Sequence, residues 1–187
     1  MALRLTEIFF SLQGEAARAG LPTVFVRLTG CPLRCVWCDT TYSFSGGEPL
    51  AQRECLPLLS ALCDAGYEVS LETSGALDIA GVNPRVARVM DLKAPASGEG
   101  DKNRWENLGL LTSRDEIKIV VASRADYEWA RALIRERRLN ALCPVLLSPA
   151  QGLVDPTALA GWILEDGLDV RFQLQLHKLL WGDAKGR

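Results

Sequence analysis

The segment from Gly30 to Cys38 contains three cysteines in the spacing C-x3-C-x2-C, at Cys31, Cys35 and Cys38. Crowded thiolates are typical ligands of soft metals and of iron–sulfur clusters. A cubane cluster has four irons, so three cysteines would leave one iron open to a ligand from outside the protein. An open iron can bind and cleave a small molecule, whereas a cluster held by four cysteines mainly carries electrons.

Two alternatives for these cysteines stay open from their spacing alone. They could be structural thiols or halves of disulfides, or they could hold a structural zinc ion. Zinc needs a fourth ligand, usually from a second cysteine pair or a histidine pair. The chain has one histidine, His177, and its other cysteines, Cys55, Cys63 and Cys143, stand singly. We expect those three to be small core residues, because free cysteine is among the most buried residue types.

The composition is that of an ordinary globular protein. The chain has 187 residues, 48% of them hydrophobic and 24% charged, with a net charge of −2. These values predict a single domain over residues 1–187, with no strong field to recruit nucleic acid or an anionic membrane. We find no apolar run long enough to span a bilayer and no signal-peptide pattern at the start. We expect a cytoplasmic location, where thiols stay reduced.

The elements that must position the cysteines follow from the pattern of apolar residues. Strands are predicted by apolar, β-branched runs over residues 23–28, 68–73, 86–92, 115–121, 141–147 and 169–176. Helices are predicted over residues 56–65, 125–138 and 157–165. This alternation predicts a parallel α/β sheet, in which ligands gather at the carboxyl ends of the strands. The loops that follow the strands should therefore share one face with the cysteines.

Several motifs together resemble one family within the radical S-adenosylmethionine (SAM) superfamily. The cysteine run, with Trp37 before the third cysteine, is similar to the superfamily as a whole. Other motifs resemble the 7-carboxy-7-deazaguanine synthase family more specifically. They are Leu12-Gln13-Gly14-Glu15, Arg27-Leu28-Thr29-Gly30, Cys38-Asp39-Thr40, Gly46-Gly47-Glu48-Pro49, Glu72-Thr73-Ser74-Gly75 and Gln175-Leu176-His177-Lys178. The likeness extends over nearly the whole chain.

The resemblance implies a fold, a reaction and a set of cofactors. The fold would be α/β, a modified partial (βα) barrel of the radical SAM type. The enzyme would be a lyase that converts 6-carboxy-5,6,7,8-tetrahydropterin to 7-carboxy-7-deazaguanine with loss of ammonia, in queuosine and deazapurine biosynthesis. A 4Fe–4S cluster would split SAM to a radical that removes a substrate hydrogen, and Mg²⁺ would organise the substrate carboxylate. The implied partners are a flavodoxin-like or ferredoxin-like reductant and a second copy in a homodimer.

The resemblance also assigns roles to individual residues. Cys31, Cys35 and Cys38 would hold the cluster, and Thr40 would bind Mg²⁺. SAM would contact Trp37, Cys38, Asp39, Gly47, Asp91, Leu92, Lys93, Ser148, Pro149, Ala150 and Gln151. The substrate would contact Leu12, Gln13, Gly14, Arg27 and Ser45. No side chain is expected to act as an acid or base, and a structural role is favoured for the lone histidine.

Elementary chemistry bears on some of these assignments. The guanidinium of Arg27 lies in an apolar strand and needs an anion, either a substrate carboxylate or an internal ion-pair partner. The hydroxyl of Thr40 is the hard oxygen ligand that Mg²⁺ prefers, although without the resemblance it would read as a turn hydroxyl. Gly46 and Gly47 would let the backbone approach a ligand closely, but such a pair also forms simple turns.

The chain departs from the family pattern after the third cysteine. Family members place a helix and a strand before the Gly-Gly-Glu-Pro motif, whereas only residues 39–45 intervene here. A helix of about 11 residues and a strand of about 5 cannot fit into that interval. We therefore expect a barrel one βα unit short, with lower stability or activity than a full-length relative. The rival functions are a glycyl-radical-enzyme activase of the same superfamily and a degenerate, non-catalytic iron–sulfur protein.

Overall fold

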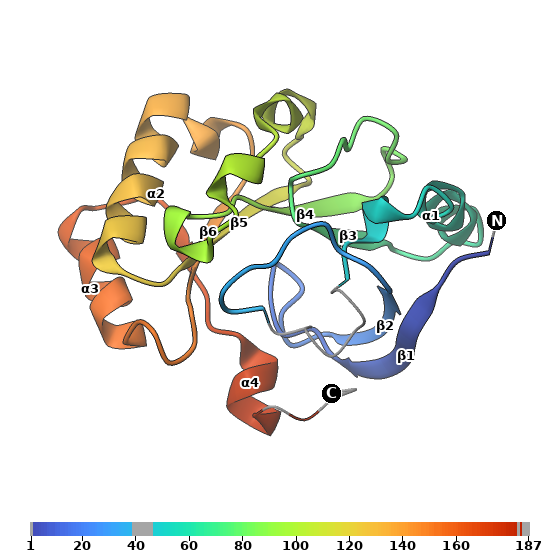
Figure 1. Ribbon diagram of the computed structural model, residues 1–187, viewed down its shortest axis with the longest axis horizontal. Coiled ribbons are helices and arrows are strands. Elements are labelled where there is room, and N and C mark those ends of the chain that lie inside the picture. Colours follow the sequence, from blue (N-terminus) through green and yellow to red (C-terminus); the bar gives the residue numbers. More distant parts are fainter. Residues whose placement is uncertain (1, 39–46, 183, 185–187) are drawn as a thin grey trace.

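The computed structural model of the chain describes residues 2–38, 47–182 and 184 (Figure 1). Three predicted site residues, Asp39, Thr40 and Ser45, lie outside the described residues. So does most of the interval in which a βα unit is predicted to be missing, and that absence stays a prediction.

A five-stranded parallel sheet, in the order β3-β4-β5-β6-β7, forms the centre of the described fold. Its strands are β3 (Ser70–Thr73), β4 (Ala87–Asp91), β5 (Glu116–Val121), β6 (Val145–Pro149) and β7 (Arg171–Phe172). Strands that follow one another in the sequence are neighbours in the sheet, and each pair is linked by a crossover. The predicted parallel α/β architecture is confirmed.

Helices α2 (Arg124–Arg137) and α3 (Pro156–Glu165) form the crossovers after β5 and β6. Short 3-10 segments lie between β4 and β5, and helix α1 (Cys55–Asp64) precedes β3. The side chain of Ser123 accepts a hydrogen bond from the Asp126 amide and so begins α2. Asp155 caps α3 in the same way, and proline follows as the first helical residue. Helices α2 and α3 lie side by side on one flank of the sheet (Figure 1) and are linked by a hydrogen bond from Tyr127 Oη to the Trp162 carbonyl.

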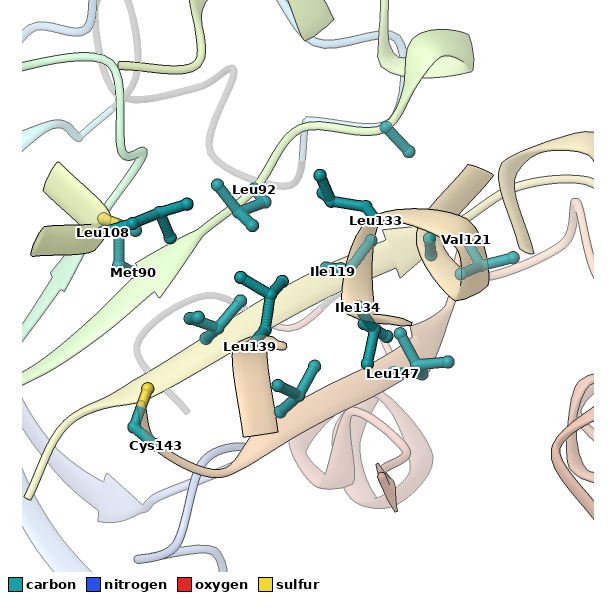
Figure 2. Packing of buried hydrophobic residues seen from close by; sticks show 14 of the residues in the cluster. Met90, Leu92, Leu108, Ile119, Val121, Leu133, Ile134, Leu139, Cys143 and Leu147 are labelled. Atoms are coloured by element: carbon teal, nitrogen blue, oxygen red, sulfur yellow. The ribbon is translucent and has the colours of Figure 1, made fainter. Parts of the chain in front are cut away.

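The two faces of the parallel sheet have opposite characters. Side chains on the helix-covered face form the hydrophobic core, in which Met90, Ile117, Ile119, Val121 and Leu147 are buried (Figure 2). The polar residues Glu72, Asp91, Lys118 and Ser148 alternate with core residues of the same strands and point to the other face. Parallel strands covered by helices on both faces read as continuous apolar runs. The polar second face therefore indicates a site.

An antiparallel ribbon of β1 (Leu5–Leu12) and β2 (Pro22–Leu28) forms a separate two-stranded sheet. The predicted strand over residues 23–28 is confirmed, but it pairs with β1, which the sequence pattern did not reveal, and not with the parallel sheet. A single parallel bridge between Gly30 and Gly47 continues the line of β2.

The end of the chain differs from the prediction. β7 covers two of the residues expected over 169–176, and the last residue of that range begins helix α4 (Leu176–Trp181). β6 starts at Val145, since residues 139–141 form a 3-10 turn. Among the described residues, no helix has both the length and the apolar character needed to cross a membrane.

Candidate active site

The cysteine segment leaves β2 through Gly30, whose φ of 99° is a conformation that glycine adopts readily. The amide of Glu48 donates to the Gly30 carbonyl at 2.8 Å, which fixes the residue before Cys31. Further along, the amide of Val36 donates to the Ser97 carbonyl at 3.1 Å. The segment is therefore tied at one end to the Gly-Gly-Glu motif and in its middle to the loop after β4.

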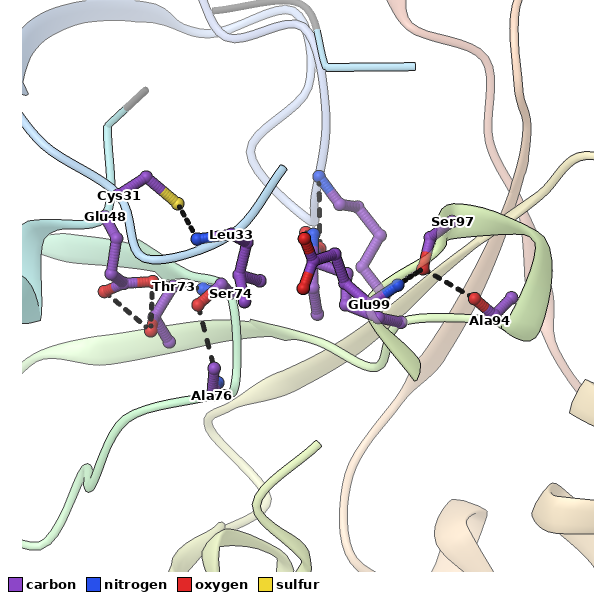
Figure 3. Close-up of polar contacts among 12 residues, drawn as sticks. Cys31, Leu33, Glu48, Thr73, Ser74, Ala76, Ala94, Ser97 and Glu99 are labelled. Carbon is purple, nitrogen blue, oxygen red and sulfur yellow. Dashed lines mark hydrogen bonds and ion pairs between the residues drawn. The ribbon is translucent and has the colours of Figure 1, made fainter. Parts of the chain in front are cut away.

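All three cysteines are partly exposed thiols. The amide of Leu33 donates to Cys31 Sγ at 3.4 Å (Figure 3). Burial raises the pKa of the Cys31 and Cys35 thiols, while the nearby ammonium group of Lys93 opposes that rise in both. The charge of Cys38 also acts on both thiols, so the three sulfurs share one electrostatic environment.

These thiols fit an iron–sulfur cluster by the chemistry of the donor set. Among the described residues, no group of three or more His, Cys, Asp or Glu side chains could hold a metal ion. A cubane cluster presents a separate iron to each of three thiolates, so its ligands need not converge on one point. Cluster binding requires the thiolate form, and the cation of Lys93 favours that form. The residues that would hold it are Cys31, Cys35 and Cys38.

The carboxylate of Glu48 fastens the cysteine segment to the carboxyl end of β3. It is buried, with 1% of the residue exposed. Its oxygens accept hydrogen bonds from the amide of Leu50 at 3.0 Å, the hydroxyl of Thr73 at 3.0 and 3.1 Å, and the amide of Ser74 at 2.5 Å (Figure 3). Gly47 precedes it, and a Cβ there would stand 3.2 Å from the Leu28 carbonyl. The Gly-Gly-Glu motif thus joins β2 to β3.

The carboxyl end of β4 carries three of the predicted SAM-binding residues. Asp91 and Lys93 form an ion pair of 2.5 Å on the polar face, near the cysteines. The loop behind them is fixed by Asn103, which bonds both the amide and the carbonyl of Lys93. Leu92 points the other way, into the hydrophobic core beside Met90 (Figure 2), so its side chain does not line the polar face.

Next to this pair lies a cluster of buried charges that sequence reasoning missed. Lys118 on β5 forms ion pairs with Glu15 and, at 3.4 Å, with Asp91. Gln13 donates to Glu72 at 3.0 Å, and Gln175 donates to the second oxygen of Glu15. The cluster thus joins the turn after β1 to strands β3, β4 and β5 and to the segment before α4.

The charges in this cluster set one another's protonation. Burial opposes ionisation of Glu15 and Asp91, but Lys118 outweighs it, so the pKa of each carboxyl is lowered. For Glu72, burial prevails and the pKa is raised. Burial also works against the charge of Lys118, yet the surrounding carboxylates raise its pKa well above the usual value. The cluster therefore holds one carboxyl that is easier to protonate beside two that stay ionised.

The end of β6 and the loop after it hold four predicted SAM-binding residues: Ser148 and Pro149 in the strand, and Ala150 and Gln151 beyond it. Ser148 lies on the polar face, 1% exposed, and its buried hydroxyl has no hydrogen-bond partner among the described residues. A buried hydroxyl without a partner is costly, which fits a position that a bound polar ligand completes. The amide of Ala150 donates to the Val121 carbonyl at 2.8 Å, and Gln151 is exposed.

The ribbon and the turn after β1 contain four of the residues predicted to contact the substrate, Leu12, Gln13, Gly14 and Arg27. Leu12 ends β1, and Gly14 passes so close to α4 that a Cβ on it would stand 2.2 Å from His177 Nδ1. Arg27 forms a 2.8 Å ion pair with Glu7 and lies over the Phe9 ring. The internal ion pair that the sequence left open is therefore present. Its contact with the substrate stays a prediction.

The structure brings most predicted residues to one edge of the sheet. The cysteine segment with Trp37, the Gly47–Glu48 turn, Asp91 and Lys93, Ser148, and the turn at Gln13 and Gly14 all meet the polar face or its carboxyl edge. The missed residues are Glu15, Glu72, Lys118 and Gln175. Their signal was present: charged residues at alternate positions within otherwise apolar strands, as in Glu116-Ile117-Lys118-Ile119.

Comparison with known proteins identifies the family. No family model matches the chain. A 7-carboxy-7-deazaguanine synthase of Koribacter versatilis is 44% identical, over 96% of this chain and 97% of its own length. One from Chlorobaculum tepidum is 43% identical, over 98% and 97%. Their alignments extend over 219 and 213 residues, so these relatives contain residues without a counterpart in the 187 of this chain.

The fold agrees with a solved structure. The crystal structure of QueE from Escherichia coli superposes with a TM-score of 0.75 and 22% identity, covering 94% of each chain. That likeness shows a shared architecture, and the predicted α/β fold of the radical SAM type is confirmed. With more than two-fifths of residues identical to curated relatives across almost the full length of both, the chain belongs to the 7-carboxy-7-deazaguanine synthase family.

Proposed function

We propose that this chain is a radical SAM lyase that converts 6-carboxy-5,6,7,8-tetrahydropterin to 7-carboxy-7-deazaguanine with loss of ammonia. The reaction belongs to queuosine biosynthesis. One observation carries the proposal: the three-cysteine segment and a buried cluster of charged and amide side chains meet at the same edge of the parallel sheet. A family member needs a cluster site and a polar substrate site side by side, and this edge offers both.

When bound, the 4Fe–4S cluster and SAM supply radical hydrogen abstraction. The side chains of the protein would hold the cluster and SAM in position. Cys31, Cys35 and Cys38 would hold the cluster, and the Asp91–Lys93 pair presents one carboxylate and one ammonium group to the polar ends of SAM. The partnerless hydroxyl of Ser148 offers a further hydrogen bond to the same ligand. Removing these contacts would weaken SAM binding without unfolding the sheet, since they lie outside the hydrophobic core.

The substrate side would be formed by Gln13, Glu15 and Glu72. A pterin edge carries both N–H donors and a carbonyl, and carboxylates with an amide beside them can pair with such an edge. Gln13 and Glu15 are buried, so little water competes for their hydrogen bonds, whereas Glu72 is accessible from the surface. Glu72, whose pKa is raised, takes up a proton more readily than an ordinary glutamate does.

A direct test is anaerobic reconstitution with iron and sulfide, followed by incubation with the carboxy-pterin, SAM and a reductant. We expect 7-carboxy-7-deazaguanine by mass spectrometry, and none from a Cys35→Ala control. A reconstituted cluster whose reduced spectrum does not respond to SAM would instead support a degenerate iron–sulfur protein. A radical transferred to a glycine of a partner protein would support an activase.

Mg²⁺ is proposed as the metal that orients the substrate carboxylate, with Thr40 as its protein ligand. The support is the hard hydroxyl oxygen of that residue, two positions after the third cysteine. Activity of the reconstituted enzyme should fall when Mg²⁺ is removed and recover when it is returned. The Thr40→Ala variant should need a higher Mg²⁺ concentration, and an unchanged requirement would exclude the ligand.

The partners and location are proposed from surface chemistry. A second copy of the chain could cover the outer face of the ribbon, where the cross-strand pairs Ile8–Val26 and Phe10–Val24 expose four apolar side chains. Analytical ultracentrifugation of wild type and Phe10→Lys would test it, since only the wild type should dimerise. A flavodoxin-like or ferredoxin-like protein would reduce the cluster. The reducing cytoplasm suits its free thiols.

A further inference from the structure

Lys118 occupies a central position between the two halves of the proposed site. It lies on β5 directly opposite Asp91 of β4 in the sheet register, and its side chain is 11% exposed. Its ammonium group contacts Glu15 on the substrate side and Asp91 on the SAM side. Asp91 in turn holds Lys93, which acts on the cysteines. One cation therefore links the turn after β1 to the carboxyl end of β4.

The charges around Lys118 come from every neighbouring element. Glu15 faces it from the turn after β1, Glu72 from β3, and Asp91 with Lys93 from β4 and the loop beyond. Glu116 lies on the same face of β5, where it accepts from the Ala17 amide at 2.9 Å and faces Arg171 of β7 at 3.8 Å. β6 contributes the neutral Ser148. Without Lys118, the carboxyl groups of Glu15, Glu72 and Asp91 would share this site with the ammonium group of Lys93.

We propose that Lys118 is a positioning residue that keeps Glu15 and Asp91 ionised and oriented, so that one side chain prepares both the substrate half and the SAM half of the site. This inference rests on the proposed function for its consequence in catalysis. Its physical basis does not, because the ion pairs exist in the chain itself. A neutral residue at this place would leave buried carboxylates that can relieve their repulsion only by taking up protons.

The test compares Lys118→Met, which keeps length without charge, with Lys118→Arg, which keeps charge. Arg88→Met is the matched control. Arg88 is equally buried and forms an ion pair of 2.6 Å with Asp115, but it lies on the core side of β4 and near its start. Loss of either pair should lower stability, whereas only loss of Lys118 should change protonation at the site.

The first measurement is an infrared pH titration of the reconstituted enzyme without substrate, which detects protonated carboxyl groups. We expect the protonation midpoint of the buried carboxyls to rise by about 1–3 pH units in Lys118→Met. It should stay near the wild-type value in Lys118→Arg, and in Arg88→Met only the carboxyl of Asp115, the partner of Arg88, should shift. An unchanged midpoint in Lys118→Met overturns the proposal, and this result is independent of whether the enzyme acts on a pterin.

The second measurement is the pH profile of kcat/KM with the carboxy-pterin. Its acidic limb should move to higher pH in Lys118→Met by the same interval, and KM for both SAM and the pterin should increase at neutral pH. A merely structural role predicts equal effects from Arg88→Met, and that outcome would refute the assignment. If Lys118→Met does not fold, Lys118→Gln carries the same expectations, because it also lacks the charge.

Discussion

The carboxylate of Glu48 offers the sharpest test of how this site is assembled. It receives hydrogen bonds from Leu50, Thr73 and Ser74, and its own amide bonds to Gly30 before the first cysteine. In Glu48→Gln one carboxylate oxygen becomes an NH2 group. That group must face the amide of either Leu50 or Ser74, so two donors meet where a donor met an acceptor.

The expected cost follows from these contacts. A hydrogen bond to a charged group contributes about 1.5–3 kcal/mol, and a buried donor left without an acceptor costs about 1–3 kcal/mol. We expect Glu48→Gln to lower the free energy of unfolding by about 2–4 kcal/mol. For a chain of this size the midpoint of thermal unfolding should fall by roughly 5–15 °C. The cluster should also be lost faster in air, because the turn that fixes Gly30 is loosened.

The assay is chemical denaturation of anaerobic protein, followed by circular dichroism, together with iron and sulfide content over time. Glu106→Gln is the matched control, since that side chain is exposed and makes the same chemical change. It should unfold within about 0.5 kcal/mol of wild type. If Glu48→Gln were as stable as the control and kept its cluster equally long, the reasoning from the hydrogen bonds would be wrong.

Three further predictions concern other parts of the site and fold. Gly14→Ala would place a Cβ 2.2 Å from His177 Nδ1 and should cost about 1–3 kcal/mol in unfolding free energy, whereas Gly161→Ala, with open space around it in α3, should not destabilise. Burial opposes ionisation of Asp115, but hydrogen bonds from Arg88 and Thr112 lower its pKa. The Asp115 carboxylate should therefore stabilise the fold fully above the ordinary aspartate pKa of about 3.9, and this stabilisation should be lost as pH falls through the lowered pKa. In urea unfolding, the loss of unfolding free energy caused by Asp115→Asn should accordingly become smaller in acid. Cys31→Ala should abolish the absorbance of the reconstituted cluster, whereas Cys63→Ala, on the far side of α1, should retain it; equal loss in both would mean that the assignment of ligands is wrong.

The sequence predicted the parallel sheet well, because its strands carry buried apolar runs. Ile117, Ile119 and Val121 alternate with other residues on β5 and face the helices, which is the pattern that a strand requires. The ends of elements were less predictable. Gly66 ends α1 as expected, with a φ of 87°, whereas β7 stops at Phe172, before Gln173, whose side chain bonds the backbone of Ala16.

The buried charges were not predicted, and the reason is physical. Lys118 and Glu72 sit at alternate positions in short strands, as solvent-facing residues of a half-exposed strand would. Only the tertiary fold shows that their face is covered by the turn after β1. The partners are also distant in sequence: Lys118 and Glu15 are separated by 103 positions and Gln175 and Glu15 by 160. No local pattern could join them.

The opposite characters of the two sheet faces have a consequence for how this fold can change. Packing that resists unfolding is concentrated under the helices, whereas the groups that meet ligands stand on the reverse side of the same strands. Exchanging a residue on the polar face of the sheet therefore alters ligand contacts while leaving the apolar layer under the helices intact. New specificities can therefore arise at these alternate positions while the apolar layer under the helices keeps its packing.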